Sequence, residues 1–532
     1  ADASPHALIG GPSGSGKTNL LLTMISSMAT RYSPDELEFY LLDFKEGVSF
    51  AQFAPGRRDR TWLPHARLVG VNINTDREFG LALLQFLSEE MRRRAEAAKA
   101  HEVTKLEELR AADPEGRWPR IVAVIDEFQY LFAERDSVTR AATLLLEDVA
   151  RRGRSQGIHL VLASQDVSGI EAFWGRRAIF EQFVLRIALP RARRVLADPN
   201  DATLDLPRWH AVLNHESGIK HGNEIVRIPD ASGTGSVATD EPRGGPSVHT
   251  VQHDLHARYH SGQAEPRLFD GSRAPRFAEL VAELSGTDPA ESAGRALTDA
   301  APRALVGQSI DVAASAAAVR LPSAPGRNLG VLASVGRDAV QVLGAAAASL
   351  ASQFRPGEVD VLIAPLVAEA AAPAAWLRNV VSAAGHTAET VPLDRVRARV
   401  DALAAEVTER LGGAASRRPV VVVLYAADAA DTVLEREGTE SMRRLLRFGP
   451  ETGVHVLGWW RSVQRLRALL MMSASIDDLG AWVALDVQGS ELQALVPGMM
   501  INWSPRPGRG LFFDRAQHAA PEVVIVPSLE EL

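Results

Sequence analysis

The sequence GPSGSGKT at residues 11–18 follows the apolar run Ala7-Leu8-Ile9 and precedes a stretch that predicts a helix from residue 18 to about residue 28. It matches the pattern G-x-x-x-x-G-K-[ST], in which glycines let backbone N–H groups turn inward on a phosphate. The lysine can then reach the β- and γ-phosphates, and the threonine hydroxyl can bind Mg²⁺. We therefore predict a site for ATP and Mg²⁺ formed by Gly11, Pro12, Ser13, Gly14, Ser15, Gly16, Lys17, Thr18 and Asn19.

The composition describes a soluble protein with enough apolar material for sizeable cores, since 46% of the 532 residues are hydrophobic and 23% are charged. The absence of cysteine excludes disulfides, cysteine-bound zinc and thiol catalysis. No apolar run approaches the roughly 18 residues of a membrane span. Only ten residues precede Gly11. We therefore expect a cytoplasmic protein that lacks an N-terminal region, with any membrane tether in that region.

A second motif ends the apolar run 121–125 with two carboxylates, Asp126 and Glu127. Carboxyl ends of parallel strands form the ligand-binding edge of such a sheet. Asp126 is placed to hold Mg²⁺, and Glu127 to activate the water that attacks the γ-phosphate. Gln165 follows the next apolar run, 158–163, where it can contact the γ-phosphate or the attacking water. His159 lies inside that run and is interpreted as a core histidine with a satisfied ring.

Strand and helix patterns alternate through the first half of the chain, which predicts a parallel α/β sheet covered by helices. The further strands are expected at 37–42, 68–72 and 183–188, and a long helix at about 76–101. Residues 43–47 follow a strand end, so they belong either to the ligand-binding edge or to a solvated loop.

Five segments together resemble the FtsK/SpoIIIE family, namely 11–18, 42–45, 124–128, 153–160 and 163–165. Members of that family are RecA-like hexameric ATPases that pump double-stranded DNA, and their relatives include the tandem-domain EccC motors of type VII secretion. The resemblance covers about residues 5–230. It implies ATP hydrolysis at the interfaces of a homo-oligomeric ring, with an arginine supplied by the neighbouring protomer.

The position of that arginine stays open between two pairs of residues. The segment Glu90-Met91-Arg92-Arg93-Arg94 is similar to a Glu-Met-x-Arg-Arg stretch in those motors, so Arg93 and Arg94 are candidates. The alternatives are Arg151 and Arg154. A basic run on a helix is otherwise a solvated surface.

The second half of the chain repeats the first, because residues 33–39 align with 355–361 at an offset of 322 positions. Repeats of this size set the architecture. The repeat lacks the functional residues: Ala339 aligns with Lys17, and Tyr425 and Ala426 align with Asp126 and Glu127. We expect two tandem RecA-like α/β domains, an active one at 1–230 and a degenerate one at 303–532, joined by a linker at 231–302.

Three further expectations concern the repeat and the linker. The stretch from residue 230 to about 246 is rich in Gly, Ser, Thr and Pro and predicts a flexible connection. Arg461 takes the position of Gln165 in the repeat. Trp459, Trp460 and Trp503 are either interface aromatics or core residues, and the core is favoured for at least one of the adjacent pair because neighbours on a strand face opposite sides.

The leading functional hypothesis is a hexameric ATP-driven translocase of double-stranded DNA that grips phosphates without strong sequence preference. The net charge of −8 argues against a nucleic-acid coat protein but leaves room for a basic central pore. The alternative is a protein-export motor of the type VII secretion kind, in which the degenerate domain binds substrate or regulates the ring. A nucleotide-gated scaffold is disfavoured by the intact Asp126-Glu127 pair.

Overall fold

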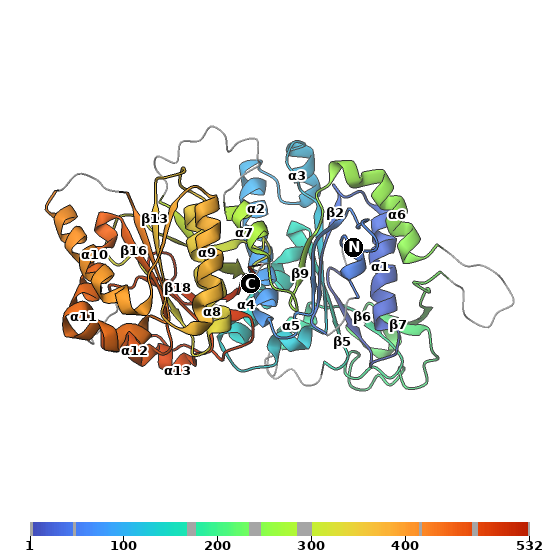
Figure 1. Ribbon diagram of the computed structural model, residues 1–532. Helices are drawn as coiled ribbons and strands as arrows, with labels where there is room; N and C mark the ends of the chain where they lie inside the picture. The colour runs from blue at the N-terminus through green and yellow to red at the C-terminus, as the bar shows by residue number, and fades with distance from the viewer. Residues whose placement is uncertain are drawn as a thin grey trace. The chain divides into compact units, whose positions relative to one another are not determined.

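The computed structural model describes residues 4–45, 49–167, 177–233, 246–284, 301–413, 418–470 and 477–529. The chain forms two compact units, the first made almost wholly of residues 1–273 and the second of residues 274–532. Each unit contains one sheet with helices on both faces (Figure 1). None of the helices in the described ranges has the length and apolar character that a membrane span requires.

The first unit begins with a buried strand whose carboxyl end leads into the glycine-rich loop. Its strands are β1 (Ala7–Gly10), β2 (Leu37–Asp43), β3 (Ala66–Val71), β4 (Arg120–Asp126), β5 (Ile158–Ser164), β6 (Leu185–Ala188), β7 (His210–Asn214), β8 (Asn223–Arg227) and β9 (Arg267–Asp270). Its helices are α1 (Lys17–Arg31), α2 (Arg77–Ala100), α3 (Leu106–Ala112), α4 (Ser137–Arg152), α5 (Arg177–Glu181) and α6 (Val248–Tyr259).

The nine strands of this sheet are ordered β8-β7-β6-β1-β5-β4-β2-β3-β9. All neighbours from β6 to β9 in this order are parallel, whereas β7 and β8 run antiparallel at the other edge. Helices α1 and α6 cover one face of the sheet, and α2 and α4 cover the other (Figure 1). The alternating βα pattern therefore produces the predicted parallel α/β sheet, and the carboxyl ends of β1, β4 and β5 meet at one edge.

The second unit has the same core order of strands as the first. Its strands are β10 (Arg303–Ser309), β11 (Ala316–Arg320), β12 (Leu329–Leu332), β13 (Asp360–Pro365), β14 (Thr387–Thr390), β15 (Val420–Tyr425), β16 (Val454–Trp460), β17 (Ala481–Ala484), β18 (Arg509–Asp514) and β19 (Glu522–Ile525). The order β17-β12-β16-β15-β13-β14 repeats β6-β1-β5-β4-β2-β3, and β18 and β19 repeat the antiparallel edge.

The helices of the second unit are α7 (Phe277–Leu284), α8 (Gly336–Ala351), α9 (Ala371–Ala383), α10 (Val396–Leu411), α11 (Asp431–Phe448), α12 (Val463–Leu469) and α13 (Gly489–Leu492). Trp459 and Trp460 are both buried, and they belong to the cores on opposite faces of this sheet. Trp503 lies in the same core as Trp460. Each of the three indoles is thus a core residue of its own unit.

Equivalent hydrogen bonds support the repeat at atomic level. In the first unit the imidazole of His159 lies 2.9 Å from the carbonyl oxygen of Pro5, as expected for a satisfied core histidine. In the second unit His455 lies 2.8 Å from the carbonyl oxygen of Arg327, which is 322 positions after Pro5. The two units therefore share their apolar cores and the hydrogen bonds that support the strands.

The segment 231–302 does not form a simple linker in the described residues. Helix α6 packs against α1, and β9 pairs with β3, so both elements are parts of the first unit. Helix α7 packs in the second unit, where Phe277 contacts Trp376. Most of the predicted flexible stretch, residues 234–245, lies outside the described residues.

Candidate functional site

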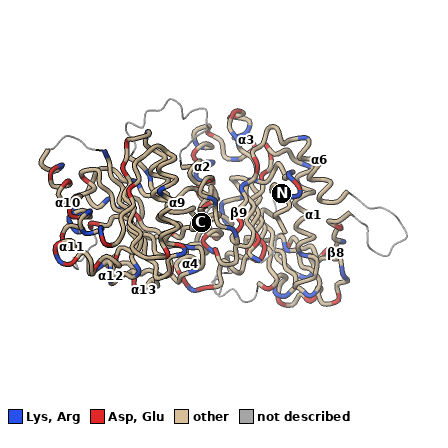
Figure 2. Tube along the Cα trace, in the orientation of Figure 1, with Lys and Arg blue, Asp and Glu red and all other residues tan. Residues whose placement is uncertain are grey.

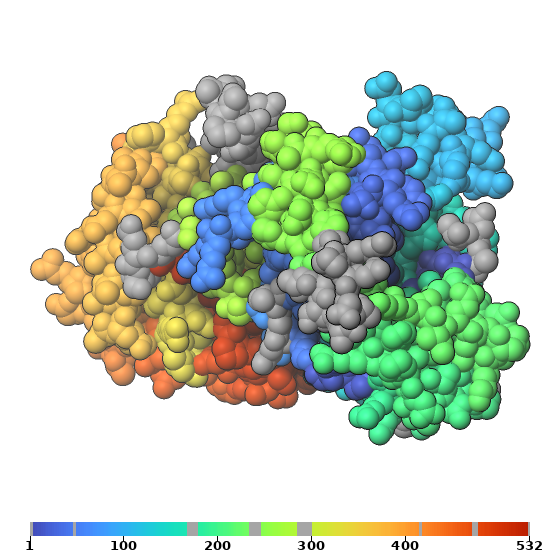
Figure 3. Space-filling view, turned by 90° about the vertical axis from the view of Figure 1, so that its right-hand side faces the viewer, coloured from blue at the N-terminus to red at the C-terminus, as the bar shows by residue number. Residues whose placement is uncertain are grey.

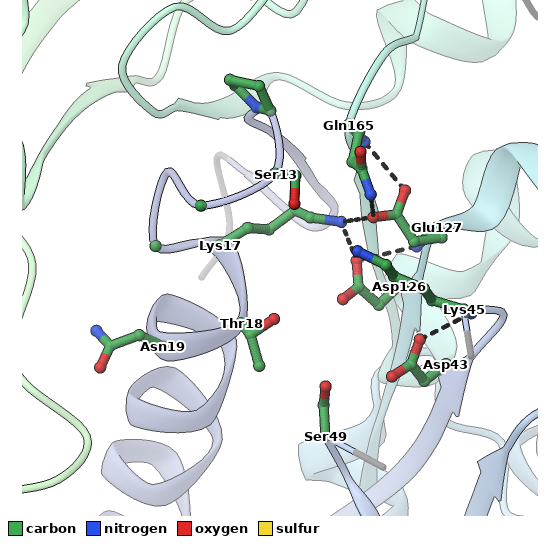
Figure 4. A pocket seen from close by; sticks show the side chains of 13 residues that line it. Ser13, Lys17, Thr18, Asn19, Asp43, Lys45, Ser49, Asp126, Glu127 and Gln165 are labelled. Atoms are coloured by element: carbon green, nitrogen blue, oxygen red, sulfur yellow. Dashed lines mark hydrogen bonds and ion pairs between the residues drawn. The ribbon is translucent and has the colours of Figure 1, made fainter. Parts of the chain in front are cut away.

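The glycine-rich loop connects β1 to α1 and curls through two left-handed residues, Gly14 (φ 78°) and Gly16 (φ 99°). A side chain is strained at such φ values, so these positions favour glycine. The loop borders a cavity of about 470 Å³ that also reaches the ends of β2, β4 and β5 (Figure 4). The cavity is lined by Pro12, Ser13, Gly14, Gly16, Lys17, Thr18, Asn19, Asp43, Lys45, Ser49, Asp126, Glu127 and Gln165.

The Lys17 ammonium lies between the two carboxylates at the end of β4 (Figure 4). Its Nζ is 2.5 Å from Asp126 Oδ1 and 2.6 Å from Glu127 Oε1. All three side chains are buried. Two residues from one motif and one from another therefore meet in a single ionic cluster beside the glycine-rich loop.

Glu127 is fixed by its backbone and by two amide side chains. It adopts the left-handed conformation (φ 53°), which is uncommon for a residue other than glycine and costs free energy. Gln165 Nε2 donates to Glu127 Oε1 at 2.7 Å, and Gln129 Nε2 donates to Oε2 at 2.7 Å. Burial raises the pKa of Glu127, but the Lys17 charge and these hydrogen bonds outweigh burial and hold the pKa below its usual value. Glu127 is therefore an oriented, ionised carboxylate.

For Asp126 and Asp43, burial outweighs the stabilising contacts, so the pKa of each is raised. Burial raises the pKa of Asp126 despite the Lys17 ammonium beside it. Burial, with the negative charge of Asp126, raises the pKa of Asp43 to about 6. Mg²⁺ prefers oxygen ligands, and the Asp126 carboxylate and Thr18 hydroxyl border the cavity from opposite sides (Figure 4). The donor set fits a magnesium ion, which would neutralise charge on the phosphate oxygens.

The cavity lining contains most of the predicted site residues and adds three others. Gly11 and Ser15 shape the loop without lining the cavity. The sequence did not decide whether residues 43–47 form part of the ligand-binding edge or a solvated loop. Asp43 and Lys45 of this range line the cavity, as does Ser49 just beyond it. Sequence reasoning missed Ser49, and it missed Gln129, which donates to Glu127. No local sequence motif identifies either residue as part of the site.

Asn19 borders the cavity, but its amide points away from the ionic cluster (Figure 4). Its Nδ2 donates to the carbonyl oxygen of Pro229 at 2.6 Å, and its Oδ1 accepts from the N–H of Ala231 at 2.7 Å. The side chain therefore fastens α1 to the segment after β8. These contacts favour a structural role for Asn19, and phosphate binding by its side chain stays a prediction.

The predicted arginine finger Arg94 is a buried structural residue. Its Nε donates to Glu90 Oε1 at 2.6 Å, and its Nη1 donates to the carbonyl oxygen of Gln156 at 2.7 Å. The second unit repeats this arrangement, in which Arg410 contacts Glu406 and donates to the carbonyl oxygen of Thr452. A guanidinium held in this way inside its own unit does not reach the surface, which favours a structural role for Arg94 over that of an arginine finger.

The other arginine candidates differ in how firmly they are held. Arg93 is half exposed, pairs with Glu90 and stacks over the Trp118 ring at 4.3 Å. Arg151 pairs with Glu147 one turn earlier on α4. Arg154 is exposed and forms no ion pair with any described residue.

The loop of the second unit that corresponds to the glycine-rich loop has a different backbone. Helix α8 starts at Gly336, three residues before Ala339, whereas α1 starts at Lys17 itself. The residues that curl around the cavity in the first unit thus form the first helical turn in the second. The N–H groups of Ser334 and Val335 donate to the Asp486 carboxylate at 2.7 and 3.0 Å, so an internal anion occupies these donors.

The remaining positions of the second site are filled by other side chains. Tyr425 is buried at the position of Asp126. Ala426 keeps the left-handed conformation of Glu127 (φ 56°) without its carboxylate. Arg461, at the position of Gln165, pairs instead with the buried Asp428. In the described part of the second unit, no lysine and no carboxylate stand where the first unit has its ionic cluster.

Fold and site together define an α/β P-loop ATPase domain followed by a second domain of the same architecture. Residues 1–169 match the FtsK/SpoIIIE family, which confirms the resemblance drawn from the motifs for this part of the chain.

Several curated proteins with similar sequences are named as secretion system proteins. The chain is 26% identical over 265 residues to the ESX secretion system protein EccC of Geobacillus thermodenitrificans, an alignment that covers 45% of this chain but 17% of that protein. Two solved structures share its fold across 99% of its length. The cytoplasmic domain of the type VII secretion ATPase EccC of Thermomonospora curvata has a TM-score of 0.64 and 22% identity, with 61% of it covered. EccC ATPases 2 and 3 of the same organism, in complex with a signal sequence peptide, have a TM-score of 0.58 and 16% identity, with 88% covered.

Proposed function

We propose that the chain is the motor part of a type VII secretion ATPase, which hydrolyses ATP in its first unit to drive protein export. The observation that carries the catalytic part is the buried cluster of Lys17, Asp126 and Glu127 beside a curled glycine-rich loop. The secretion part rests on the relatives, which are EccC proteins. On this proposal the chain works in the cytoplasm, as part of a longer protein.

In the proposed reaction each residue has a separate task. The loop N–H groups and Lys17 bind the phosphates, which compete with the two carboxylates for the lysine ammonium. Thr18 and Asp126 would hold Mg²⁺. Glu127, ionised and oriented by Gln165 and Gln129, accepts the proton of the attacking water. Movement of Gln165 on γ-phosphate loss would transmit hydrolysis to β5 and beyond.

We further propose that the first unit works at an interface between copies of this chain and that Arg154 completes the site of a neighbour. Arg93, Arg94 and Arg151 are engaged in ion pairs within their own unit. Arg154 is exposed and has no competing carboxylate among the described residues. In a mixed assembly, an Arg154→Ala subunit with an intact cavity should reduce hydrolysis at its neighbour's site.

The substrate of the motor is proposed to be a protein rather than DNA. One of the structures similar in fold, EccC ATPases 2 and 3, was solved with a signal sequence peptide. The predicted preference for double-stranded DNA gains no support from these relatives. Figure 2 shows basic and acidic residues interspersed along the described trace of each unit.

ATP hydrolysis by the purified chain tests both levels of the proposal. Lys17→Ala should abolish nucleotide binding, and Glu127→Gln should keep binding but lower turnover roughly 100-fold or more. Lys220→Ala and Glu147→Gln are matched surface controls in the same unit. Unchanged turnover in Glu127→Gln would refute the catalytic assignment. Stimulation of the wild type by long duplex DNA, with no response to an export-signal peptide, would refute the secretion assignment and restore the DNA motor.

A further inference from the structure

Helix α6 carries two histidines that face a carboxylate from a distant loop. His249 and His253 lie one turn apart on this helix, and the Nε2 atoms of both are 3.0 Å from Asp59 Oδ2. The two Nε2 atoms are 3.2 Å from each other. Figure 3 shows α6, in lime green, at the surface of the face that it displays. The three side chains thus converge where solvent has access.

The carboxylate is oriented by contacts that leave one oxygen for the histidines. Asp59 Oδ1 accepts from the N–H and the hydroxyl of Thr61, both at 2.9 Å. Gln252 Nε2, from the same helix and three residues after His249, donates to the carbonyl oxygen of Thr61 at 3.3 Å. These contacts hold the loop against α6 independently of the histidines. A carboxylate or imidazole positioned by such outer contacts is characteristic of metal ligands.

We propose that Asp59, His249 and His253 form a binding site for a divalent transition metal of the zinc class. Their ligand atoms all lie within 4.8 Å of one another. Two ligands at zinc distances of about 2.0–2.1 Å in tetrahedral geometry are about 3.3 Å apart. The three separations of 3.0, 3.0 and 3.2 Å are close to that value. Three protein ligands leave a fourth position for water.

The ligand types separate this site from the nucleotide site of the same unit. Imidazole nitrogen suits zinc, copper, nickel and cobalt, whereas Mg²⁺ is bound through oxygen. The cavity beside Lys17 offers hydroxyl and carboxylate oxygens but no histidine. A metal of the zinc class at Asp59 and Mg²⁺ at Asp126 would therefore bind without competing.

The proposed metal would join two segments that support the nucleotide-binding helix. Leu255 and Val248 of α6 pack in the same core as Leu21 and Ile25 of α1. Asp59 belongs to the loop between β2 and β3. A metal held by both segments would stabilise α6 on α1, because binding to the folded state alone raises stability.

Calorimetric titration of the EDTA-treated full chain with Zn²⁺ tests the site. The wild type should bind one Zn²⁺ ion with an affinity that excess Mg²⁺ does not change, and Zn²⁺ should raise its melting temperature. Asp59→Asn and His253→Ala should each weaken binding at least about tenfold, and Thr61→Val should weaken it by about tenfold through lost orientation. His260→Ala is the matched control, since this histidine follows α6 outside the cluster.

Spectra with Co²⁺ in place of Zn²⁺ provide an independent measurement of geometry. The wild type should give the strong visible absorption of tetrahedral cobalt, and Asp59→Asn should lose it while its circular dichroism remains that of the wild type. Equal Zn²⁺ affinity in the wild type and Asp59→Asn, or an equal loss in His260→Ala, would overturn the proposal. A Lys17→Ala variant that binds no Zn²⁺ would also overturn it, because the ion would then occupy the nucleotide site.

Discussion

Replacing Arg94 with alanine distinguishes a structural arginine from an arginine finger. In the wild type its guanidinium is buried, pairs with Glu90 at 2.6 Å and donates to the carbonyl oxygen of Gln156 at 2.7 Å. The contacts join α2 to the turn before β5, whose last residue, Ser164, precedes Gln165. We expect Arg94→Ala to destabilise the first unit even in the monomeric chain and without nucleotide.

The expected cost follows from burial of the pair. Removing one partner of a buried ion pair costs roughly 3–5 kcal/mol, and a carbonyl left without a donor adds to that loss. Glu90 retains its contact with Arg93 at 2.7 Å, which moderates the penalty. We therefore expect a loss of about 3 kcal/mol in the first unit. Arg93→Ala, whose side chain is 50% exposed, should cost at most about 1 kcal/mol.

Hydrogen exchange measured by mass spectrometry is the suitable assay, because a chain of two units need not unfold in one step. In Arg94→Ala, peptides from α2 and β5 should lose about 3 kcal/mol of protection, while peptides from β12 to β17 should not change. Arg410→Ala is the matched variant and should produce the reverse pattern. Wild-type protection in Arg94→Ala together with lost hydrolysis would refute the structural role.

Three further predictions concern single residues. The pKa of Asp43 is raised to about 6, so the native state retains a proton that the unfolded chain releases near pH 4, and stability falls as pH rises between these values. Asp43→Asn should remove this fall and be about 3 kcal/mol more stable than the wild type at pH 7.5 in urea titrations; equal pH profiles would contradict it. Ala339→Lys should not create a second active site, so a chain that also carries Lys17→Ala should bind no nucleotide. The same substitution should destabilise the second unit, because Ala339 is buried. Asn19→Ala should lower the melting temperature while leaving ATP affinity within about twofold, and a large loss of affinity would restore it as a phosphate ligand.

The sequence was sufficient to predict the mostly parallel sheets and to bring Lys17, Asp126 and Glu127 to one edge of the first, because local patterns determine both. The strand before Asp126 is an apolar run, and the loop before Lys17 has a fixed spacing of glycines. Parallel strands bring such ends to one edge whatever lies between them. The same reasoning predicted the degenerate repeat, since the offset of 322 places Ala339 at the position of Lys17, and the apolar run 420–424 ends in Tyr425 and Ala426 where the run 121–125 ends in two carboxylates.

Arg94 became a candidate through the similarity of residues 90–94 to a Glu-Met-x-Arg-Arg stretch, which does not distinguish buried from exposed arginines. The buried positions of α2 include Leu87, Met91, Arg94 and Ala98, which are spaced by four, three and four residues on one helix face. Counting this spacing would have separated Arg94 from its exposed neighbours. By contrast, no local pattern predicts the pairing of β9 with β3, because the two segments are distant in sequence. The Gly- and Ser-rich stretch before α6 suggested that the first domain ends near residue 230, whereas the first unit continues to Arg273.

The contacts of Asp486 have a consequence for how the two units would respond to cellular energy. Ser334 and Val335 donate to a carboxylate that belongs to the chain itself, so a phosphate would have to displace Asp486 to reach these donors, and no lysine aligned with Lys17 is present to favour the exchange. We therefore expect a fall in the ATP-to-ADP ratio to change the first unit and not the second. In an assembly of such chains the second unit would act as a constant reference against which the first unit cycles.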